Sequence, residues 1–184
     1  MNKALFSVLI PLILIAFVAQ SANAHGPSRQ KVVEKIEIGA SPDKIWDIVK
    51  NFSDFSWHPM VKSVSQEGSG VGSKRILKFD GDVTITQALD KLVPEKKLIS
   101  WRIQESVNEV LAVNSYAAII IVGGEENSKT TVTYKAGFYR GFMGNDPPEE
   151  LNDANSKKKV TRFIKAGLEA VSYTHLTLPT ILLV

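Results

Sequence analysis

The sequence predicts an α+β fold in which a curved antiparallel sheet is covered by one long helix near the C-terminus. Seven stretches carry strand signals, either as apolar and polar residues in alternation or as short β-branched runs. Turn sequences such as FDGD, VPEK and GGEENSK separate several of them at the spacing of hairpins. A sustained apolar stripe at helical spacing follows the last strand. These observations favour one domain with one core.

The first strand is predicted over Val32–Ile38, and a short helix follows it. Ser41 is expected to cap this helix, and Pro42 to occupy its first position, where a missing N–H costs no hydrogen bond. Four apolar side chains at i, i+3, i+4 and i+7 predict a buried stripe, made of Ile45, Ile48, Val49 and Phe52. We expect this segment to be structural.

Six further strands are predicted after this helix. The expected ranges are Val61–Glu67, Lys74–Phe79, Val83–Leu89, Leu98–Gln104, Asn114–Val122 and Thr130–Phe138. In the last of these, alternate side chains fall on opposite faces of the strand. One face is therefore expected to be buried and the other exposed to solvent. The buried face consists of Val132, Tyr134, Ala136 and Phe138.

The closing helix is predicted to begin at Asp146, which precedes two prolines and has Glu149 three residues on, a pattern typical of a helix N-terminus. Its buried stripe is expected to contain Val160, Phe163, Ile164, Gly167, Leu168 and Val171. Because sheet and helix are joined mainly at the edges, such a fold can leave an apolar cavity between the two.

Both ends of the chain differ from the body. Residues 1–24 predict a cleavable secretory signal peptide, since Lys3 precedes an uncharged run that ends at Ala22-Asn23-Ala24. A membrane anchor is disfavoured because the run from Ala4 to Val18 is shorter than the ~20 residues of a spanning helix. A periplasmic protein with a single domain over residues 25–170 is expected. Residues 171–184 carry no charged side chain, resemble translated sequencing-adapter sequence, and are expected to be neither helical nor native.

Composition excludes several classes of function. The formal net charge is only +3, and no basic stripe predicts nucleic-acid binding. The chain has no cysteine, so disulfides and thiolate metal sites cannot form. Gly68–Ser73 lacks the ending of a phosphate-binding loop and predicts a hairpin. A copper site formed by the mature N-terminal His25 with His58 is a minor alternative, and we assign no metal and no cofactor.

The order of these elements resembles a known superfamily. The pattern looks like that of the SRPBCC superfamily. It consists of a strand, the helix beginning Ser41-Pro42, the stretch Trp57-His58-Pro59, the glycine-rich loop before Lys74-Arg75, a long meander and a closing helix. That superfamily includes START-type lipid-transfer domains, birch-pollen allergens and polyketide cyclase/dehydrase-like proteins. The resemblance covers about Lys31 to Glu169 and implies the helix-grip fold.

A narrower resemblance concerns His25-Gly26-Pro27, Asp54–Pro59 and Phe138–Gly141 with the following Asn145–Asp153. These segments look like the MxaD-type periplasmic proteins of bacterial methanol oxidation. The resemblance implies an accessory protein, without catalytic residues of its own, whose partners are methanol dehydrogenase and its cytochrome c acceptor. The C-terminus departs from that family, in which the last helix continues beyond Glu169.

In the resembled fold, the turn at Trp57 and His58 lies near the mouth of a cavity. His58 has no evident partner beyond Asp54, so a rim position is favoured over a catalytic base. Arg75 could anchor an acidic headgroup, and other aromatic residues could line the cavity: Trp101, Tyr116, Tyr134, Tyr139 and Phe142. Each of these could equally be plain core or surface.

A protein partner could be contacted by the loop from Tyr139 to Glu150, which contains Arg140, Phe142 and Met143, and by the basic run Lys157-Lys158-Lys159. A solvated helix face is the ordinary interpretation of that run. Three hypotheses therefore stand: an accessory factor of methanol oxidation, a carrier of a small hydrophobic or lipid-like ligand, and a cyclase or dehydratase that uses His58.

Overall fold

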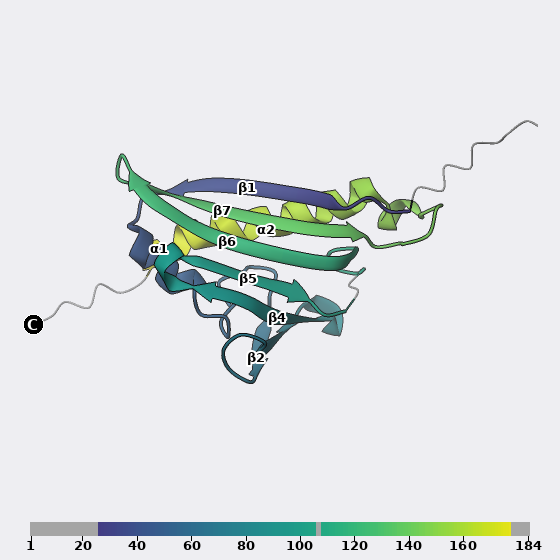
Figure 1. Ribbon diagram of the computed structural model, residues 1–184, viewed down its shortest axis with the longest axis horizontal. Coiled ribbons are helices and arrows are strands. Elements are labelled where there is room, and N and C mark those ends of the chain that lie inside the picture. The colour runs from purple at the N-terminus through teal and green to yellow at the C-terminus, as the bar shows by residue number, and fades with distance from the viewer. Residues whose placement is uncertain (1–25, 106–107, 178–184) are drawn as a thin grey trace, which may run out of the picture.

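The computed structural model describes residues 26–105 and 108–177, and within them seven antiparallel strands form one sheet in the order β1-β7-β6-β5-β4-β3-β2 (Figure 1). Every predicted strand is present, with small shifts of its ends. The strands are β1 (Gln30–Ile38), β2 (Ser63–Glu67), β3 (Lys74–Lys78), β4 (Thr84–Val93), β5 (Leu98–Ile103), β6 (Val113–Glu126) and β7 (Lys129–Arg140).

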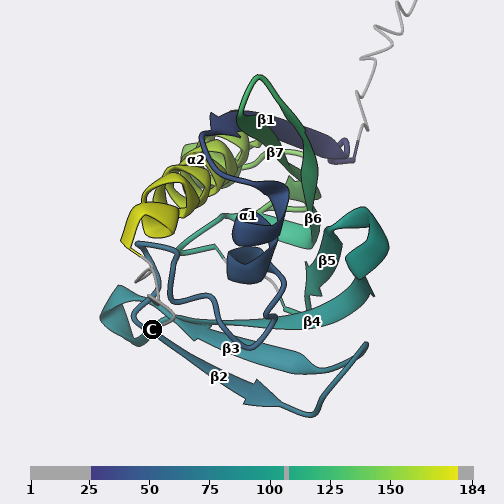
Figure 2. The same ribbon diagram turned by 90° about the vertical axis from the view of Figure 1, so that its left-hand side faces the viewer.

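The sheet curls around two helices, α1 (Pro42–Val49) and α2 (Asp153–Thr177), as Figure 2 shows from the end of the molecule. The helix α2 packs against β1, β7 and α1. The antiparallel pairing of β1 with β7, from Gln30 opposite Phe138 to Ile38 opposite Thr130, joins the first strand to the last. This is the predicted α+β helix-grip architecture, a curved antiparallel sheet around a long C-terminal helix.

The first helix begins as predicted. The hydroxyl of Ser41 accepts a hydrogen bond from the backbone N–H of Lys44 at 3.5 Å, and Pro42 occupies the first turn. Three members of the expected stripe, Ile45, Val49 and Phe52, are buried, and Ile48 packs against the core at its edge. The segment is structural, as expected.

The start of α2 differs from the prediction. Glu149–Leu151 form the short 3-10 helix η3, and α2 begins only at Asp153. Asn152 supplies the cap, because its Oδ1 accepts from the N–H of Asn155 at 2.8 Å. The backbone of Pro148 is extended, with ψ of 155°. Two consecutive prolines favour such extended backbone and so delay the helix.

The end of α2 also differs, because the helix continues to Thr177 and therefore includes residues 171–177, which were expected to be non-helical. Val171 is buried in the core, as its place in the predicted stripe requires. Residues 178–184 lie outside the described residues, as do the proposed signal peptide and His25. No helix in the described part of the chain is long and apolar enough to span a membrane.

The core lies between the concave face of the sheet and α2. The predicted inner face of β7 is buried, and so is the stripe on α2 formed by Val160, Phe163, Ile164, Gly167, Leu168 and Val171. Large side chains occupy the space in which an apolar cavity could have formed. The largest of them are Trp101, Arg75, Tyr116, Tyr134, Phe55, Phe138 and Phe163.

Candidate functional site

A buried arginine distinguishes the core. The side chain of Arg75 on β3 is only 2% exposed. The register of β3 and β4 places it opposite Gln87, whose Oε1 accepts from Arg75 Nε at 2.8 Å. Arg75 Nη1 donates to the carbonyl oxygen of Phe52 at 3.2 Å, whereas Nη2 has no hydrogen-bond partner. None of the ion pairs within the described residues includes Arg75.

Three aromatic rings surround this guanidinium. Its central carbon lies 4.4 Å from the ring centroid of Phe52, 4.0 Å from that of Phe55 and 4.8 Å from that of Trp101. Cation–π contacts of this kind contribute about 2 kcal/mol or more when they are desolvated. Burial nevertheless lowers the pKa of Arg75 from 12.5 to about 9, so the side chain stays charged at neutral pH and the charge is costly in the fold.

Two tyrosines complete what we call the Arg75 cluster: Phe52, Phe55, Arg75, Gln87, Trp101, Tyr116 and Tyr134. The hydroxyl oxygens of Tyr116 and Tyr134 lie 3.5 Å apart. A bulge in β6 between Asn114 and Ala117 sets the direction of Tyr116. Burial raises the pKa of Tyr134 to about 12 and that of Tyr116 well above 10. Both are therefore neutral, and one of the two hydroxyl protons is left to donate elsewhere.

His58 lies beside this cluster and is fully buried, so its predicted position at the rim is wrong. Its Nδ1 accepts from the N–H of Met60 at 3.3 Å, so Nε2 carries the proton and donates to the carbonyl oxygen of Phe163 at 3.0 Å. Burial lowers the pKa of His58 from 6.5 to about 4, which keeps the ring neutral. Because backbone groups engage both ring nitrogens, neither is free to act as a base.

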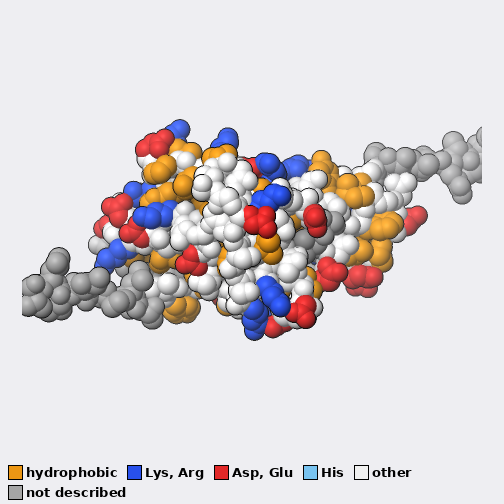
Figure 3. Space-filling model, turned by 90° about the horizontal axis from the view of Figure 1, so that it is seen from below, with side chains coloured by type: hydrophobic (Ala, Val, Ile, Leu, Met, Phe, Trp, Pro, Cys, Tyr) orange, Lys and Arg blue, Asp and Glu red, His pale blue; other side chains and the backbone are white. Residues whose placement is uncertain are grey.

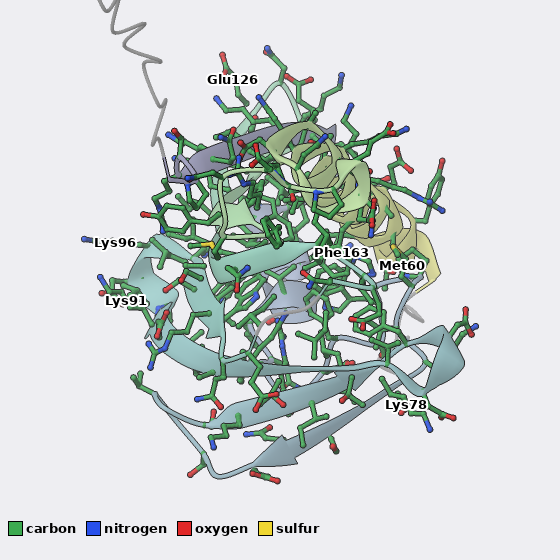
Figure 4. All side chains as sticks on the ribbon, turned by 90° about the vertical axis from the view of Figure 1, so that its right-hand side faces the viewer. Met60, Lys78, Lys91, Lys96, Glu126 and Phe163 are labelled. Carbon is green, nitrogen blue, oxygen red and sulfur yellow. The ribbon has the colours of Figure 1, made fainter. Side chains whose placement is uncertain are left out.

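Gly167 on α2 explains why His58 can reach the helix. A Cβ atom at this position would lie 2.8 Å from His58 Cδ2 and 3.3 Å from Trp57 Cζ3. The imidazole stacks on Phe163, with ring centroids 4.0 Å apart, and on Phe55 at 5.3 Å. Figure 4 shows Phe163 on the inner side of α2 and Met60 beside the helix. The absent side chain of Gly167 thus makes room for the Trp57-His58 turn.

A surface pocket of about 400 Å³ opens next to this turn. Its lining residues come from the turn, the β3–β4 connection, the segment before β6 and α2: Pro59, Met60, Phe79, Asp80, Glu109, Val110, Lys159 and Arg162. The Phe79 ring lies 6.3 Å from that of Phe163, which lies 6.4 Å from that of Phe55, and Phe55 contacts Arg75. A row of aromatic rings therefore connects the pocket with the Arg75 cluster.

Of the predicted cavity residues, Arg75, Trp101, Tyr116 and Tyr134 come together in the cluster, whereas Tyr139 and Phe142 do not. Tyr139 faces outward because side chains alternate along β7 and its neighbour Phe138 points inward. The guanidinium of Arg29 covers the Tyr139 ring at 5.7 Å. Phe142 lies on the surface and is 39% exposed. Trp57 is half-buried against the core.

The loop of residues 141–150, which we call the acidic loop, is held by Arg140. Its Nε donates to the carbonyl oxygen of Phe142 at 2.8 Å, its Nη2 to that of Gly144 at 2.6 Å, and its Nη1 to Asp153 at 3.0 Å. Arg140 is 8% exposed and so, contrary to prediction, is not available to a partner. By fixing the backbone of the acidic loop, Arg140 keeps Phe142 and Met143 at the surface, where they are 39% and 49% exposed.

The basic run on α2 is divided by the structure. Lys157 and Lys158 are exposed on the outer face, whereas the Nζ of Lys159 donates to the carbonyl oxygens of Asn108 and Glu109 at 3.0 and 3.4 Å. Lys159 therefore secures the chain before β6 and, unlike the prediction, is not a free contact.

On the face shown in Figure 3, basic and acidic side chains are interspersed, and acidic and hydrophobic side chains meet at the right-hand end.

The sequence missed Gln87 and the backbone carbonyl of Phe163. Gln87 joins the site only through the register of β3 and β4, for which no local pattern gives a signal. Within the described residues, no three His, Asp or Glu side chains lie close enough together to hold a metal ion.

Solved structures with this fold include proteins of several kinds. An uncharacterized protein from Bacillus thuringiensis has a TM-score of 0.67 and 20% identity, covering 80% of this chain and 99% of that one. The Zhui aromatase/cyclase from a Streptomyces species has a TM-score of 0.63 and 16% identity, covering 81% and 94%. Truncated norcoclaurine synthase from Thalictrum flavum has a TM-score of 0.61 and 15% identity, covering 85% and 99%.

At these identities the similarity shows the fold alone. None of the curated proteins matches the sequence significantly. Residues 29–172, which include all seven strands and most of α2, match the SRPBCC-type family described as polyketide cyclase / dehydrase and lipid transport. The chain therefore belongs to this family.

Proposed function

We propose that this protein binds a small, largely apolar molecule between its sheet and α2. The observation that carries the proposal is a group of buried, unpaired polar atoms in the Arg75 cluster: Arg75 Nη2, Gln87 Nε2 and Trp101 Nε1. Each buried polar group without a partner costs about 1–3 kcal/mol. Such groups are rare in native cores, and three on neighbouring residues support a site at which a ligand supplies the missing partners.

The ligand enters from the pocket beside the Trp57-His58 turn. Phe79 lines this pocket and is itself buried, so it stands between the pocket and the interior. Because aromatic side chains fill the space around Arg75, binding displaces some of them. Trp101 contacts the guanidinium directly, and its fluorescence should therefore report ligand binding.

Uptake of 1-aminoanthracene, an uncharged fluorescent probe, tests this proposal. We expect saturable enhancement of probe fluorescence and displacement of the probe by 1-decanol. Phe79→Ala should accelerate association, whereas Leu92→Ala, which changes an exposed side chain on β4, should leave the rate unchanged. The absence of saturable binding to the folded wild-type protein would contradict the proposal.

A second proposed function is that of a periplasmic accessory factor that assists methanol dehydrogenase and its cytochrome c. The observation that favours it is the acidic loop, in which Arg140 fixes the backbone that presents Phe142 and Met143. Exposed large apolar side chains on a preorganised loop are suited to a protein interface. Neighbouring acidic groups, Asp146, Glu149 and Glu150, favour a partner surface with a basic rim.

Co-purification from a methanol-grown host tests this second function. The full chain should retain methanol dehydrogenase or cytochrome c, and Phe142→Ser with Met143→Ser should release it. Val71→Ser, at an even more exposed apolar position in the β2–β3 loop, is the control. Recovery of neither protein by the wild type counts against the function, and fractionation of the same cells tests the periplasmic location.

A further inference from the structure

We propose that the ligand of the interior site is an apolar carboxylic acid, and that its carboxylate binds Arg75 and Gln87. The inference rests on the proposed binding function and specifies the class of ligand. Three features of the Arg75 cluster carry it: the kind of polar atom that is left unpaired, the charge of the cluster, and the way in which the aromatic rings surround the guanidinium.

The unpaired groups of the cluster are hydrogen-bond donors. Arg75 Nη2, Gln87 Nε2 and Trp101 Nε1 can only donate, and the tyrosine pair has one further proton to offer. The acceptor oxygen of Gln87 is already used by Arg75 Nε. A ligand that satisfies these groups must supply several acceptor lone pairs. An ionised carboxylate does so, because it has two oxygens and no proton to donate.

The cluster also carries a positive charge, and within the described residues no carboxylate forms an ion pair with Arg75. Asp54 is the carboxylate that acts most on Arg75, but it lies at the surface, where its Oδ1 accepts from the N–H and hydroxyl of Ser56 at 2.9 and 2.6 Å. His58, Tyr116 and Tyr134 are neutral near pH 7. An anionic ligand would neutralise the charge of Arg75 and relieve the cost of burying it alone.

The aromatic rings restrict how such a ligand is bound. Phe52, Phe55 and Trp101 cover the guanidinium, so an incoming group meets N–H groups at its edge. Planar carboxylates bind arginine in this edge-on arrangement. The apolar part of the ligand then lies among the rings of Phe55 and Phe163, on the side of the entrance pocket. A compact aromatic acid matches the chemistry of these rings, some of which it displaces on binding.

A matched pair of probes tests the inference by isothermal titration calorimetry at pH 7: 2-naphthoate, which carries a carboxylate, and 2-naphthalenemethanol, which has a similar shape and no charge. We expect the wild type to bind 2-naphthoate at least tenfold more tightly. Arg75→Met should weaken 2-naphthoate at least tenfold and weaken the alcohol much less, because the alcohol carries no charge. Gln87→Leu should act in the same direction with a smaller effect. Arg162 lines the entrance pocket, so Arg162→Met tests whether a positive charge at the surface, and not Arg75, attracts the carboxylate of the probe.

Each outcome separates the two proposals. Equal affinity of the wild type for both probes overturns the carboxylate inference and leaves the binding function in place, whereas binding of neither probe overturns both. The selectivity for 2-naphthoate could also persist in Arg75→Met and disappear in Arg162→Met. That result would place the carboxylate at the surface and would also overturn the inference. The wild-type comparison needs no variant, so the test holds even where a substitution in the cluster prevents folding.

Discussion

The buried imidazole of His58 predicts a specific dependence of stability on pH. In the folded protein its pKa is about 4, whereas an exposed histidine has a pKa of 6.5. The unfolded chain therefore binds a proton more tightly than the folded chain between these two values. The free energy of unfolding should fall as the pH drops from 6.5 to 4, and this loss should be absent above pH 6.5.

The magnitude follows from the two pKa values. A tenfold change in a protonation equilibrium corresponds to about 1.36 kcal/mol, so the fall from 6.5 to about 4 amounts to roughly 3 kcal/mol. Such a loss is a large part of the roughly 5–15 kcal/mol by which a typical domain is stable. The physical origin is desolvation, because a charged imidazole would be buried among the rings of Phe55 and Phe163 and close to the positive charge of Arg75.

Urea denaturation at pH 7, 6, 5 and 4 measures the effect. Carboxylates also titrate in this range, so the informative quantity is the difference between the wild type and His58→Gln, which keeps an amide donor for the carbonyl of Phe163 and does not titrate. The wild type should lose roughly 3 kcal/mol more than the variant between pH 7 and 4. Identical pH dependence of the two proteins, or an imidazole of His58 that titrates near pH 6.5 by NMR, would refute the reasoning.

Three further substitutions have defined outcomes. Gly167→Ala should lower the free energy of unfolding by about 1 kcal/mol in urea, because crowding of His58 by about 1–3 kcal/mol outweighs a helix-propensity gain of about 1 kcal/mol. Arg140→Met should cost at least about 2 kcal/mol and accelerate hydrogen exchange in the acidic loop, since it removes three hydrogen bonds from a charged donor. Asn152→Ala should cost about 1 kcal/mol, measured by thermal unfolding, through loss of the α2 cap. Unchanged stability in any of these variants contradicts the corresponding contact.

Local patterns were sufficient where one element determines the outcome. The alternation in β7 and the helical stripe on α2 placed Tyr134 and Phe163 on buried faces, because side-chain direction follows from the period of the element itself. Ser41 and Pro42 marked the start of α1 for the same local reason. The predicted start of α2 at Asp146 was wrong, because the two prolines that follow favour extended backbone and the helix begins only at Asp153.

The sequence by itself therefore determined the order of the elements, the covered face of the sheet and the fold that joins them, since these depend on periodicities within single segments. Only the tertiary structure decided what the unusual residues do. It buried His58 against Gly167, which lies far along the chain, and it engaged Arg140 and Lys159 in hydrogen bonds to other parts of the same chain. It also placed Arg75 opposite Gln87 and outside the ion pairs of the described residues, because strand register and sheet curvature bring together groups whose spacing in the sequence has no period.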